Sequence, residues 1–297
     1  MRNQFFIIRN PKAGLAARQF FDATVAALKA SGASIEVLET SRYGDGKGAA
    51  ARAAESGRFD AVLAAGGDGT VNDVADGLVG LPTPLGIIPL GTANVLAREI
   101  GLPRSPGELA RSLSEGAVRE IAIGRANGRP FLFVVGVGFD AAAVRIFEQE
   151  STRRLGQAGY AWPILRAVFS HKDRPLRIET AHGITEAHWV LVTRTKHYAG
   201  SRVLAPDADL KQPHFHVVYV FGDNPWTRIR QLAALGLNRL SRDPEVRIEV
   251  TDRVSIEGDR TTPVQIDGEA LGELPLDIRI DPQRLRVIFP APPDMRG

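Results

Sequence analysis

The chain has 297 residues, of which 44% are hydrophobic and 24% are charged, and its formal net charge is +3. This length allows a sizeable core and favours two domains, and the composition is that of an ordinary globular protein. With no cysteine in the sequence, disulfides and thiolate chemistry are excluded. The pI of about 9.4 favours anionic partners such as phosphates or acidic membranes without selecting one of them.

The apolar runs of the sequence are too short to cross a membrane. The longest, 131–139, contains two glycines and falls short of the roughly 20 residues that a spanning helix needs. The run at 5–8 is too short for a signal peptide. We therefore expect a cytoplasmic protein whose contact with membranes is peripheral.

The first part of the chain alternates apolar runs with helical patterns. Strands are predicted at 5–9, 35–39, 60–65 and 85–89. Helices are predicted up to Gly32, at 47–56, after 70, at 95–100, and from a capping box at 105–108 to about Gly116. This alternation predicts a parallel sheet with helices, and ligands of such sheets bind at the carboxyl ends of the strands.

Beyond about residue 124 the pattern changes to short β-like runs separated by turn residues. They lie at 131–137, 174–180, 186–193, 215–221, 246–250, 254–257, 263–267 and 274–280. Helical inserts are predicted near 140–150, 160–170 and 226–236. The pattern indicates a mostly antiparallel second domain, a sandwich or a barrel, and the last run, 285–289, fits either domain.

The stretch Gly66-Gly67-Asp68-Gly69-Thr70 stands where a strand turns into a helix. Its glycines let backbone N–H groups approach an anion, and the helix N-terminus adds partial positive charge. Asp68 could hold magnesium or accept a proton. A tight connection without function is the weaker reading, because an acid stands inside the glycines. The ordinary P-loop pattern is absent from the sequence, so we predict a different kind of nucleotide phosphate site.

Two further motifs have competing interpretations. Gly136-Val137-Gly138-Phe139-Asp140-Ala141 fits a dinucleotide fingerprint, but 151–172 contains no acid for a ribose, so we interpret its glycines as packing and turn residues. Asp267-Gly268-Glu269 has the form of a hairpin turn. It could equally supply the carboxylate that positions and deprotonates an acceptor hydroxyl, if the first domain holds a phosphoryl donor.

Histidines and a basic segment complete the candidates. His214 and His216 have metal-ligand spacing on one strand face, but no third ligand is evident and zinc is disfavoured. The basic segment Arg153–Arg177 carries Trp162, Leu165 and Phe169 at helical spacing. A helix of this kind lies on an anionic membrane or packs its apolar stripe on the sheet, and the sequence leaves both open.

These motifs make the chain similar to the diacylglycerol kinase catalytic-domain family, which includes bacterial lipid kinases and sphingosine kinases. The matching segments span nearly the whole chain. In the first half they are Asn10-Pro11-Lys12-Ala13-Gly14, Gly66-Gly67-Asp68-Gly69-Thr70-Val71-Asn72, Gly77-Leu78, Pro89-Leu90-Gly91-Thr92-Ala93-Asn94 and Ala97-Arg98. In the second half they are Gly136-Val137-Gly138-Phe139-Asp140, Tyr198-Ala199-Gly200, Ala205-Pro206-Asp207-Ala208 and Asp267-Gly268-Glu269. Each segment is modest evidence, but the ordered set is specific.

The resemblance implies a fold, cofactors and roles for individual residues. The fold is an α/β domain like that of phosphofructokinase and NAD kinase, at 1–124 with 284–297 returning to it, followed by a β-sandwich domain at 125–283. The cofactors are ATP and magnesium, and the acceptor is a lipid hydroxyl. The implied ATP-site residues are Asn10, Pro11, Lys12, Ala13, Gly14, Thr40, Gly66, Gly67, Asp68, Gly69, Thr70, Val71, Asn72, Thr92 and Asn94.

The resemblance also implies where the reacting proton goes. Glu269, with Asp267 beside it, would accept this proton, although in the sphingosine kinase branch the role has also been given to the aspartate that matches Asp68. We favour the pair Asp267 and Glu269, and we assign Asp68 to the magnesium that accompanies ATP.

Two departures from the family pattern are informative. The family often has two aspartates and a glycine that bind a structural magnesium where this chain has Lys211-Gln212-Pro213. We therefore predict that this second metal is absent, with Lys211 as a candidate source of charge in its place. Val95 replaces an aspartate that commonly follows the asparagine at 94, which removes one helix-start contact and makes altered activity conceivable.

The sequence thus predicts an ATP-dependent lipid kinase of phospholipid metabolism, acting on a diacylglycerol-like, phosphatidylglycerol-like or sphingoid lipid in the cleft between the domains. The alternatives are a kinase of a soluble metabolite on the same fold, resembling NAD kinase, and a sensor that binds nucleotide or lipid without catalysis. We expect a lipid at an anionic membrane surface as partner and no nucleic acid, and a homodimer is compatible with the sequence.

Overall fold

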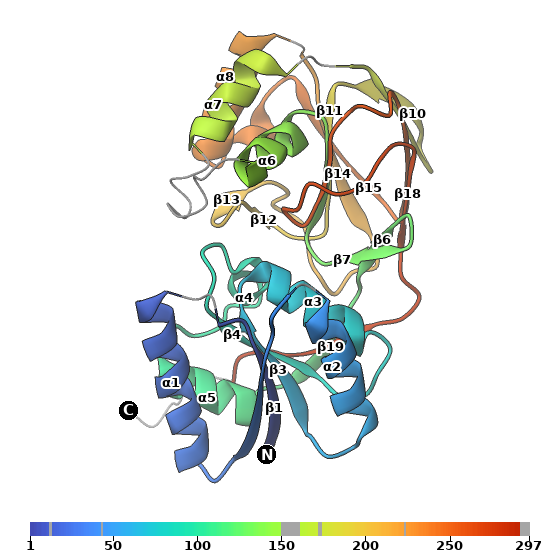
Figure 1. Cartoon of the computed structure of the whole chain (residues 1–297). Coiled ribbons are helices and arrows are strands. Elements are labelled where there is room, and N and C mark those ends of the chain that lie inside the picture. The colour runs from blue at the N-terminus through green and yellow to red at the C-terminus, as the bar shows by residue number, and fades with distance from the viewer. Residues whose placement is uncertain (12–13, 43, 150–160, 172–173, 223, 292–297) are drawn as a thin grey trace. The chain divides into compact units, whose positions relative to one another are not determined.

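The computed structural model describes residues 1–297 apart from 12–13, 43, 150–160, 172–173, 223 and 292–297. The chain forms two compact units (Figure 1). The first comprises 1–122 and 282–297, and the second comprises 123–281. The boundaries drawn from the sequence alone lie at 124 and 284.

The first unit contains a six-stranded sheet with the order β2-β1-β3-β4-β19-β5. Its strands are β1 (Gln4–Arg9), β2 (Ser34–Glu39), β3 (Ala61–Gly66), β4 (Leu85–Pro89), β5 (Val118–Ile121) and β19 (Leu285–Ile288). The strands β1 to β4 run parallel, as the alternating pattern predicts. Near the C-terminus the chain returns as β19, which pairs parallel with β4 and antiparallel with β5.

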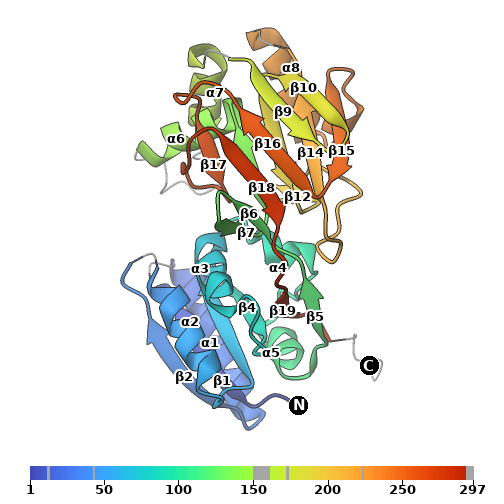
Figure 2. The same ribbon diagram turned by 90° about the vertical axis from the view of Figure 1, so that its right-hand side faces the viewer.

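Helices cover both faces of this sheet (Figures 1 and 2). They are α1 (Leu15–Ala30), α2 (Asp45–Glu55), α3 (Asp68–Leu78), α4 (Val95–Glu99) and α5 (Pro106–Glu115). On one face α1 packs against α5, and the core there combines Phe5 and Leu63 of the sheet with Phe21, Leu28 and Leu113 of the helices. On the other face α2 packs against α3. Because helices cover both faces, β3 is buried along its whole length and reads as an unbroken apolar run.

The capping box predicted at the start of α5 is wrong. The Ser105 hydroxyl makes no capping hydrogen bond, although the helix begins at Pro106 as expected. The turn is closed by the backbone instead, since the Leu109 N–H donates to the Ser105 carbonyl at 2.9 Å. Proline at the first helical position is enough to set this start, because its fixed φ suits the helix and its missing N–H is not needed there.

The second unit is built from two antiparallel sheets. The first has the order β10-β9-β16-β18-β6-β7 and the second the order β15-β14-β11-β8-β17, with a small additional pair β12-β13. The strands are β6 (Gly124–Ala126), β7 (Arg129–Phe131), β8 (Val134–Val137), β9 (Leu176–Thr180), β10 (Gly183–Ala187), β11 (Trp189–Thr193), β12 (His197–Tyr198), β13 (Arg202–Val203), β14 (Phe215–Val220), β15 (Val246–Thr251), β16 (Arg253–Glu257), β17 (Val264–Ile266) and β18 (Leu276–Ile280).

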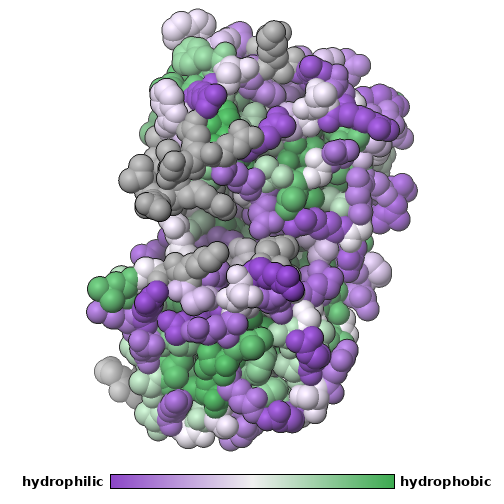
Figure 3. Space-filling view, viewed as in Figure 1, coloured by the Kyte–Doolittle hydropathy of each residue, from purple (hydrophilic) through white to green (hydrophobic). Residues whose placement is uncertain are grey.

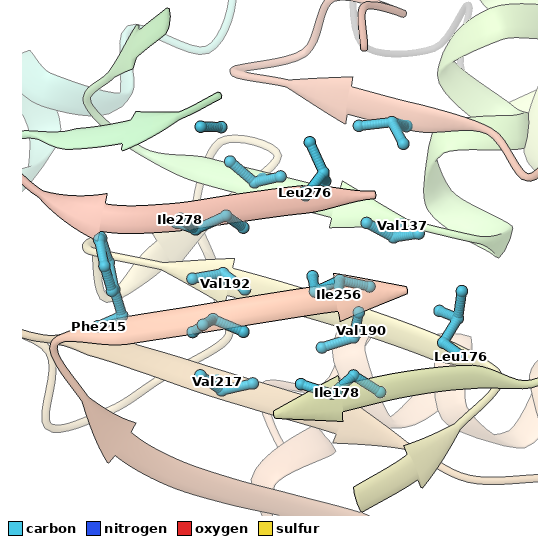
Figure 4. Close-up of a cluster of buried hydrophobic side chains, with 14 of the residues drawn as sticks. Val137, Leu176, Ile178, Val190, Val192, Phe215, Val217, Ile256, Leu276 and Ile278 are labelled. Atoms are coloured by element: carbon cyan, nitrogen blue, oxygen red, sulfur yellow. The ribbon is translucent and has the colours of Figure 1, made fainter. Parts of the chain in front are cut away.

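The inner faces of these two sheets enclose one hydrophobic core (Figure 4). Ile178, Ile256 and Ile278 come from the six-stranded sheet, whereas Val192 and Val217 come from the five-stranded sheet. All five side chains are fully buried. The predicted β-sandwich is therefore confirmed, and of the two architectures that the sequence left open the barrel is not the one formed.

Two predicted strands are each divided in the structure. The run 131–137 is split between β7 and β8, and the run 186–193 between β10 and β11. In both cases the first strand belongs to the six-stranded sheet and the second to the five-stranded sheet. Apolar residues stand on both sides of each crossing because both sheets face the same core.

Three helices of the second unit lie side by side in the order α6, α7, α8 (Figures 1 and 2). Their bounds are α6 (Phe139–Gln149), α7 (Ala161–Ser170) and α8 (Pro225–Gly236), and a short 3-10 helix follows at Leu240–Arg242. Among the described residues, no helix has the length and apolarity needed to span a membrane.

Candidate active site

Two glycine turns meet at the carboxyl ends of β3 and β4. A β-carbon on Gly91 would lie only 2.5 Å from Gly67 Cα, so the close approach of the two backbones requires glycine at position 91. A β-carbon on Gly66 would lie 2.4 Å from Thr70 Oγ1. The turns are also joined by the Leu90 N–H, which donates to the Gly66 carbonyl at 2.9 Å. Their glycines leave a bare peptide surface beside the N-terminus of α3, which suits a phosphate group.

Asp68 is the acid of this surface, and it connects the two turns. Its Oδ1 accepts the backbone N–H of Val95 at 2.6 Å, at the start of α4. Burial raises the pKa of the Asp68 carboxyl, while the Val95 and Asn94 backbone N–H groups and the Arg98 charge act in the opposite direction. A carboxylate beside a phosphate-binding surface suits magnesium, which proteins commonly hold through one or two carboxylates and the substrate phosphates. These residues therefore fit a magnesium nucleotide.

The other predicted nucleotide residues follow neighbouring strands of the same sheet. Asn10 comes directly after β1, and its N–H donates to the Ala65 carbonyl at 3.0 Å. Thr40 comes directly after β2, and its N–H donates to the Arg9 carbonyl at 2.9 Å. Residues 66–72 and 92–94 follow β3 and β4. The carboxyl ends of four adjacent parallel strands thus bring Asn10, Pro11, Gly14, Thr40, Gly66–Asn72, Thr92 and Asn94 to one edge, whereas Lys12 and Ala13 lie outside the described residues.

The Asn94 side chain is used within its own turn. Its Oδ1 accepts the Gly91 N–H at 2.9 Å, and its Nδ2 donates to the Gly91 carbonyl at 2.7 Å. Asn94 itself has a φ of 47°, a left-handed conformation that asparagine tolerates better than most residues. Its direct role is therefore to shape the second glycine turn.

Asp267-Gly268-Glu269 forms the tight hairpin turn that its sequence suggests. Asp267 and Gly268 both have positive φ, 50° and 85°, as a type I′ turn requires. Ile266 and Glu269 close the hairpin through paired backbone hydrogen bonds of 2.9 and 3.0 Å. The turn thus adds the pair Ile266 and Glu269 to the end of β17. The backbone that carries the Glu269 side chain is held by these hydrogen bonds.

The Asp267 carboxylate is committed to the backbone of the segment between β7 and β8. Its Oδ2 accepts the Leu132 N–H at 2.7 Å, and its Oδ1 accepts the Phe133 and Val134 N–H groups at 2.9 and 2.8 Å. These N–H groups lie where the chain passes from β7 in one sheet to β8 in the other. The Asp267 carboxylate accepts them in place of the carbonyl groups of a neighbouring strand. The two acids predicted to act as a pair therefore differ in their contacts. Asp267 holds the turn in place through backbone N–H groups.

Glu269 has a different environment from Asp267. Its Oε2 lies 3.0 Å from Arg129 Nη2, and both side chains are about one-third exposed. Next to it, the Ala270 N–H donates to Glu148 Oε1 at 3.1 Å. A partly exposed carboxylate that is oriented by one guanidinium can accept a proton from a substrate without breaking the fold. Glu269 is thus the better candidate for the base.

A buried carboxylate to which no role was given from the sequence lies close to this turn. Asp140, the last residue of the Gly-Val-Gly-Phe-Asp motif, accepts Trp189 Nε1–H at 3.1 Å, Gln265 Nε2–H at 3.0 Å and the Tyr198 hydroxyl at 3.3 Å. A β-carbon on Gly136 would lie 2.1 Å from Asp140 Oδ2. The interpretation of this glycine as a packing residue is therefore confirmed, because the absent side chain makes room for Asp140.

Gln265 connects Asp140 with the hairpin. While its Nε2 binds Asp140, its Oε1 accepts the Gly268 N–H at 2.8 Å, and the side chain is fully buried. The sequence feature that could have indicated this contact was the polar residue in the apolar run Val264-Gln265-Ile266, because a buried amide needs a hydrogen-bond partner. The partner itself lies 125 residues away in the sequence.

Asp140 should make stability depend on pH. Burial raises the pKa of Asp140 from 3.8 to about 6, so its contribution is fully present below about pH 4 and is lost as the pH rises through 6. We expect the unfolding free energy of the wild type, relative to Asp140→Asn, to fall by about 3 kcal/mol between about pH 4 and pH 7. Urea unfolding of both proteins across this range measures it. A difference that stays constant with pH would contradict the assignment.

The paired histidines lie at the start of β14. His216 is buried, and its ring centre is 5.4 Å from that of His214. Burial lowers the pKa of His216, and the neighbouring His214 lowers it further. No group of three or more His, Asp or Glu side chains suited to a metal ion occurs in the part of the chain that the structure describes.

Comparison with known proteins finds a match for each part of the chain. Residues 4–126 match the diacylglycerol kinase catalytic domain model, and residues 133–289 match the YegS C-terminal NAD kinase beta sandwich-like domain model. Diacylglycerol kinase of Bacillus subtilis (strain 168) is 30% identical over 296 residues, which cover 96% of this chain and 95% of that protein. The chain belongs to the diacylglycerol kinase catalytic-domain family. Membership makes it a phosphotransferase with an alcohol group as acceptor.

Further relatives match over nearly the full length of the chain. Diacylglycerol kinase of Staphylococcus saprophyticus is 29% identical over 98% of this chain and 96% of that protein. The crystal structure of a diacylglycerol kinase from Bacillus anthracis str. Sterne has a TM-score of 0.77 at 23% identity, with 97% of each chain covered. The recognition made from the motifs, and the fold it implied, are therefore confirmed.

Val95 stands where the family resemblance implies an aspartate, whose carboxylate would lie near the N-terminus of α4. The Val95 N–H is nevertheless satisfied, because Asp68 accepts it from the neighbouring turn. The substitution thus leaves the first backbone donor of α4 with a partner.

Proposed function

We propose that the chain is an ATP-dependent kinase that phosphorylates the hydroxyl group of a membrane lipid. The proposal rests on family membership and above all on Glu269, a partly exposed carboxylate on a hairpin that Asp267 holds through three backbone N–H groups. Of the two acids in this turn, only Glu269 has the setting of a general base.

The first unit would hold the phosphoryl donor. The two glycine turns and the N-terminus of α3 would bind phosphate oxygens, and Asp68 would hold the accompanying magnesium. When bound, magnesium-ATP would supply the phosphoryl group, with the metal neutralising charge on its oxygens. Burial raises the pKa of Asp68, and a bound cation would favour its carboxylate form.

The second unit would handle the acceptor. Glu269 would take the proton of the lipid alcohol while the alcohol oxygen forms a bond to the γ-phosphorus and the bond from that phosphorus to the β,γ-bridging oxygen breaks, so that ADP would be the leaving group. Arg129 keeps the Glu269 carboxylate oriented through its 3.0 Å contact. Positioning and charge stabilisation of this kind account for most of the catalysis in phosphoryl transfer.

Phosphate transfer from labelled ATP tests this function. The acceptors are diacylglycerol, phosphatidylglycerol and a sphingoid base in mixed micelles, with NAD as the soluble acceptor. The proposal expects one lipid to be labelled and NAD to stay unlabelled. Labelled NAD would instead indicate a kinase of a soluble metabolite. ATP binding without transfer to any acceptor would indicate a sensor.

Exposed apolar side chains on α7 support the membrane part of the proposal. Trp162, Leu165 and Phe169 are 56%, 49% and 63% exposed, so this stripe does not pack on the sheet. Trp226 on the adjacent α8 is also exposed. Hydrophobic residues lie among hydrophilic ones over these helices (Figure 3). Arg166 on the same helix is exposed, whereas Arg153 and Arg154 of the basic segment lie outside the described residues.

We expect the variant Trp162→Ser/Phe169→Ser to bind anionic vesicles at least roughly tenfold more weakly, because each aromatic ring inserted into the interface contributes roughly 1.5–3 kcal/mol. Sedimentation with vesicles of phosphatidylglycerol measures this binding. Ile184→Ser, which removes an exposed apolar side chain of β10, is the matched control. Equal binding by the double variant and the wild type would remove α7 from the membrane face.

A further inference from the structure

The loop between β13 and β14 lacks the residues for the structural magnesium that the family resemblance implies. Lys211, Gln212 and Pro213 occupy the positions of the two aspartates and the glycine, and all three are exposed. An ammonium group cannot bind a metal cation, and an amide supplies no charge, whereas magnesium prefers carboxylate oxygens. The residues present therefore do not fit this metal.

A buried positive charge nevertheless reaches the same loop. Arg194, directly after β11, is 1% exposed and is one of the largest fully buried side chains among the described residues. Its Nη2 donates to the Leu210 carbonyl at 2.7 Å and to the Gln212 carbonyl at 3.2 Å. The guanidinium thus binds main-chain oxygens on both sides of position 211.

Burial of a guanidinium costs free energy unless its N–H groups find acceptors. The Leu210 and Gln212 carbonyls are two such acceptors. Carbonyl oxygens are also the ligands through which hard cations hold loops together. A guanidinium offers several fixed donors and keeps its charge throughout the ordinary pH range. Arg194 can therefore satisfy this loop as a bound cation would, with the difference that it is covalently part of β11.

We propose that Arg194 is the built-in cation of the loop 204–213, and that it makes the folding of this loop independent of magnesium. Lys211, the source of charge considered from the sequence, is exposed and is not the residue that does this. The position of Arg194 also connects the loop to the hairpin that carries Asp267 and Glu269. Its backbone N–H donates to the Phe133 carbonyl at 2.8 Å, and the N–H of that same residue binds Asp267.

Thermal unfolding of the full chain without nucleotide tests this proposal, and it requires no kinase activity. We expect the wild type to melt at the same temperature in EDTA and in millimolar magnesium. Arg194→Met should lower the melting temperature by about 5 °C or more, because it removes the buried donor of the Leu210 carbonyl and the partly buried donor of the Gln212 carbonyl. Arg286→Met is the matched control: Arg286 Nη1 also donates to a carbonyl, that of Pro82 at 2.7 Å, but from an exposed position. It should shift melting by no more than about 2 °C.

A second variant tests whether Arg194 takes the place of the magnesium ion. Arg194→Met combined with Lys211→Asp, Gln212→Asp and Pro213→Gly restores the family pattern, and its melting temperature should rise with magnesium. If Arg194→Met does not fold, Arg194→Lys is measured instead, and a lowered melting temperature there supports the proposal. The proposal is overturned if magnesium stabilises the nucleotide-free wild type, or if the folded Arg194 variant melts like the wild type.

Discussion

Replacing Glu269 by glutamine is expected to lower the turnover number by about two to four orders of magnitude, the usual contribution of a general base. The amide keeps the shape of the side chain and an oxygen for Arg129, but it cannot take the proton of the acceptor alcohol. The melting temperature should stay close to that of the wild type, because the Glu269 side chain is partly exposed and the hairpin is closed by backbone hydrogen bonds. Steady-state transfer from labelled ATP measures the loss.

Glu273→Gln is the matched control for this experiment. Glu273 is an exposed carboxylate in the same connection between β17 and β18, and removing its charge should leave turnover within about twofold of the wild type. Full turnover by Glu269→Gln would remove the base assignment.

Replacing Asp267 by asparagine should affect stability first. Its carboxylate accepts three backbone N–H groups, and hydrogen bonds to a charged group contribute about 1.5–3 kcal/mol each. An amide keeps one acceptor oxygen and directs a donor at the remaining N–H groups, so we expect the unfolding free energy to fall by roughly 3 kcal/mol or more. Asparagine tolerates the positive φ of this position, so the effect reports the carboxylate rather than backbone strain.

Urea unfolding measures this loss, and Asp267→Gly provides a second measurement because glycine adopts the same φ without steric strain. Both variants should be less stable than Glu269→Gln. If Asp267→Asn keeps wild-type stability but loses turnover, the two acids have exchanged roles, and Asp267 acts on the substrate.

The contrast between these acids shows what the sequence could reveal. The strand and glycine turn at 61–70 were predictable because β3, Gly66 and α3 are consecutive and their signals are local. The hairpin at 267–268 was predictable for the same reason. The commitment of Asp267 to Leu132 was not, because these partners are separated by 135 residues and the fold alone brings them together.

The sheet to which each strand of the second unit belongs could not be predicted, for a different reason. The run 131–137 is apolar and the run 186–193 is mostly so because two sheets bury them in one core, and hydrophobicity reports burial rather than the identity of the neighbouring strand. Arg194 was missed likewise, because an arginine in a sequence is expected at the surface. Its buried position depends on carbonyl groups 16 and 18 residues further along the chain.

The most direct test of the proposed function is to identify which cellular lipid gains a phosphate. Lipids extracted from cells that overexpress the wild type are compared by mass spectrometry with those from cells that express Glu269→Gln at the same level. We expect one lipid class to appear with the added mass of a phosphate in the wild-type cells and to remain at its background level with the variant. Identical lipid profiles in the two strains, or equal phosphorylation by both proteins, would contradict a lipid kinase that uses Glu269 as its base.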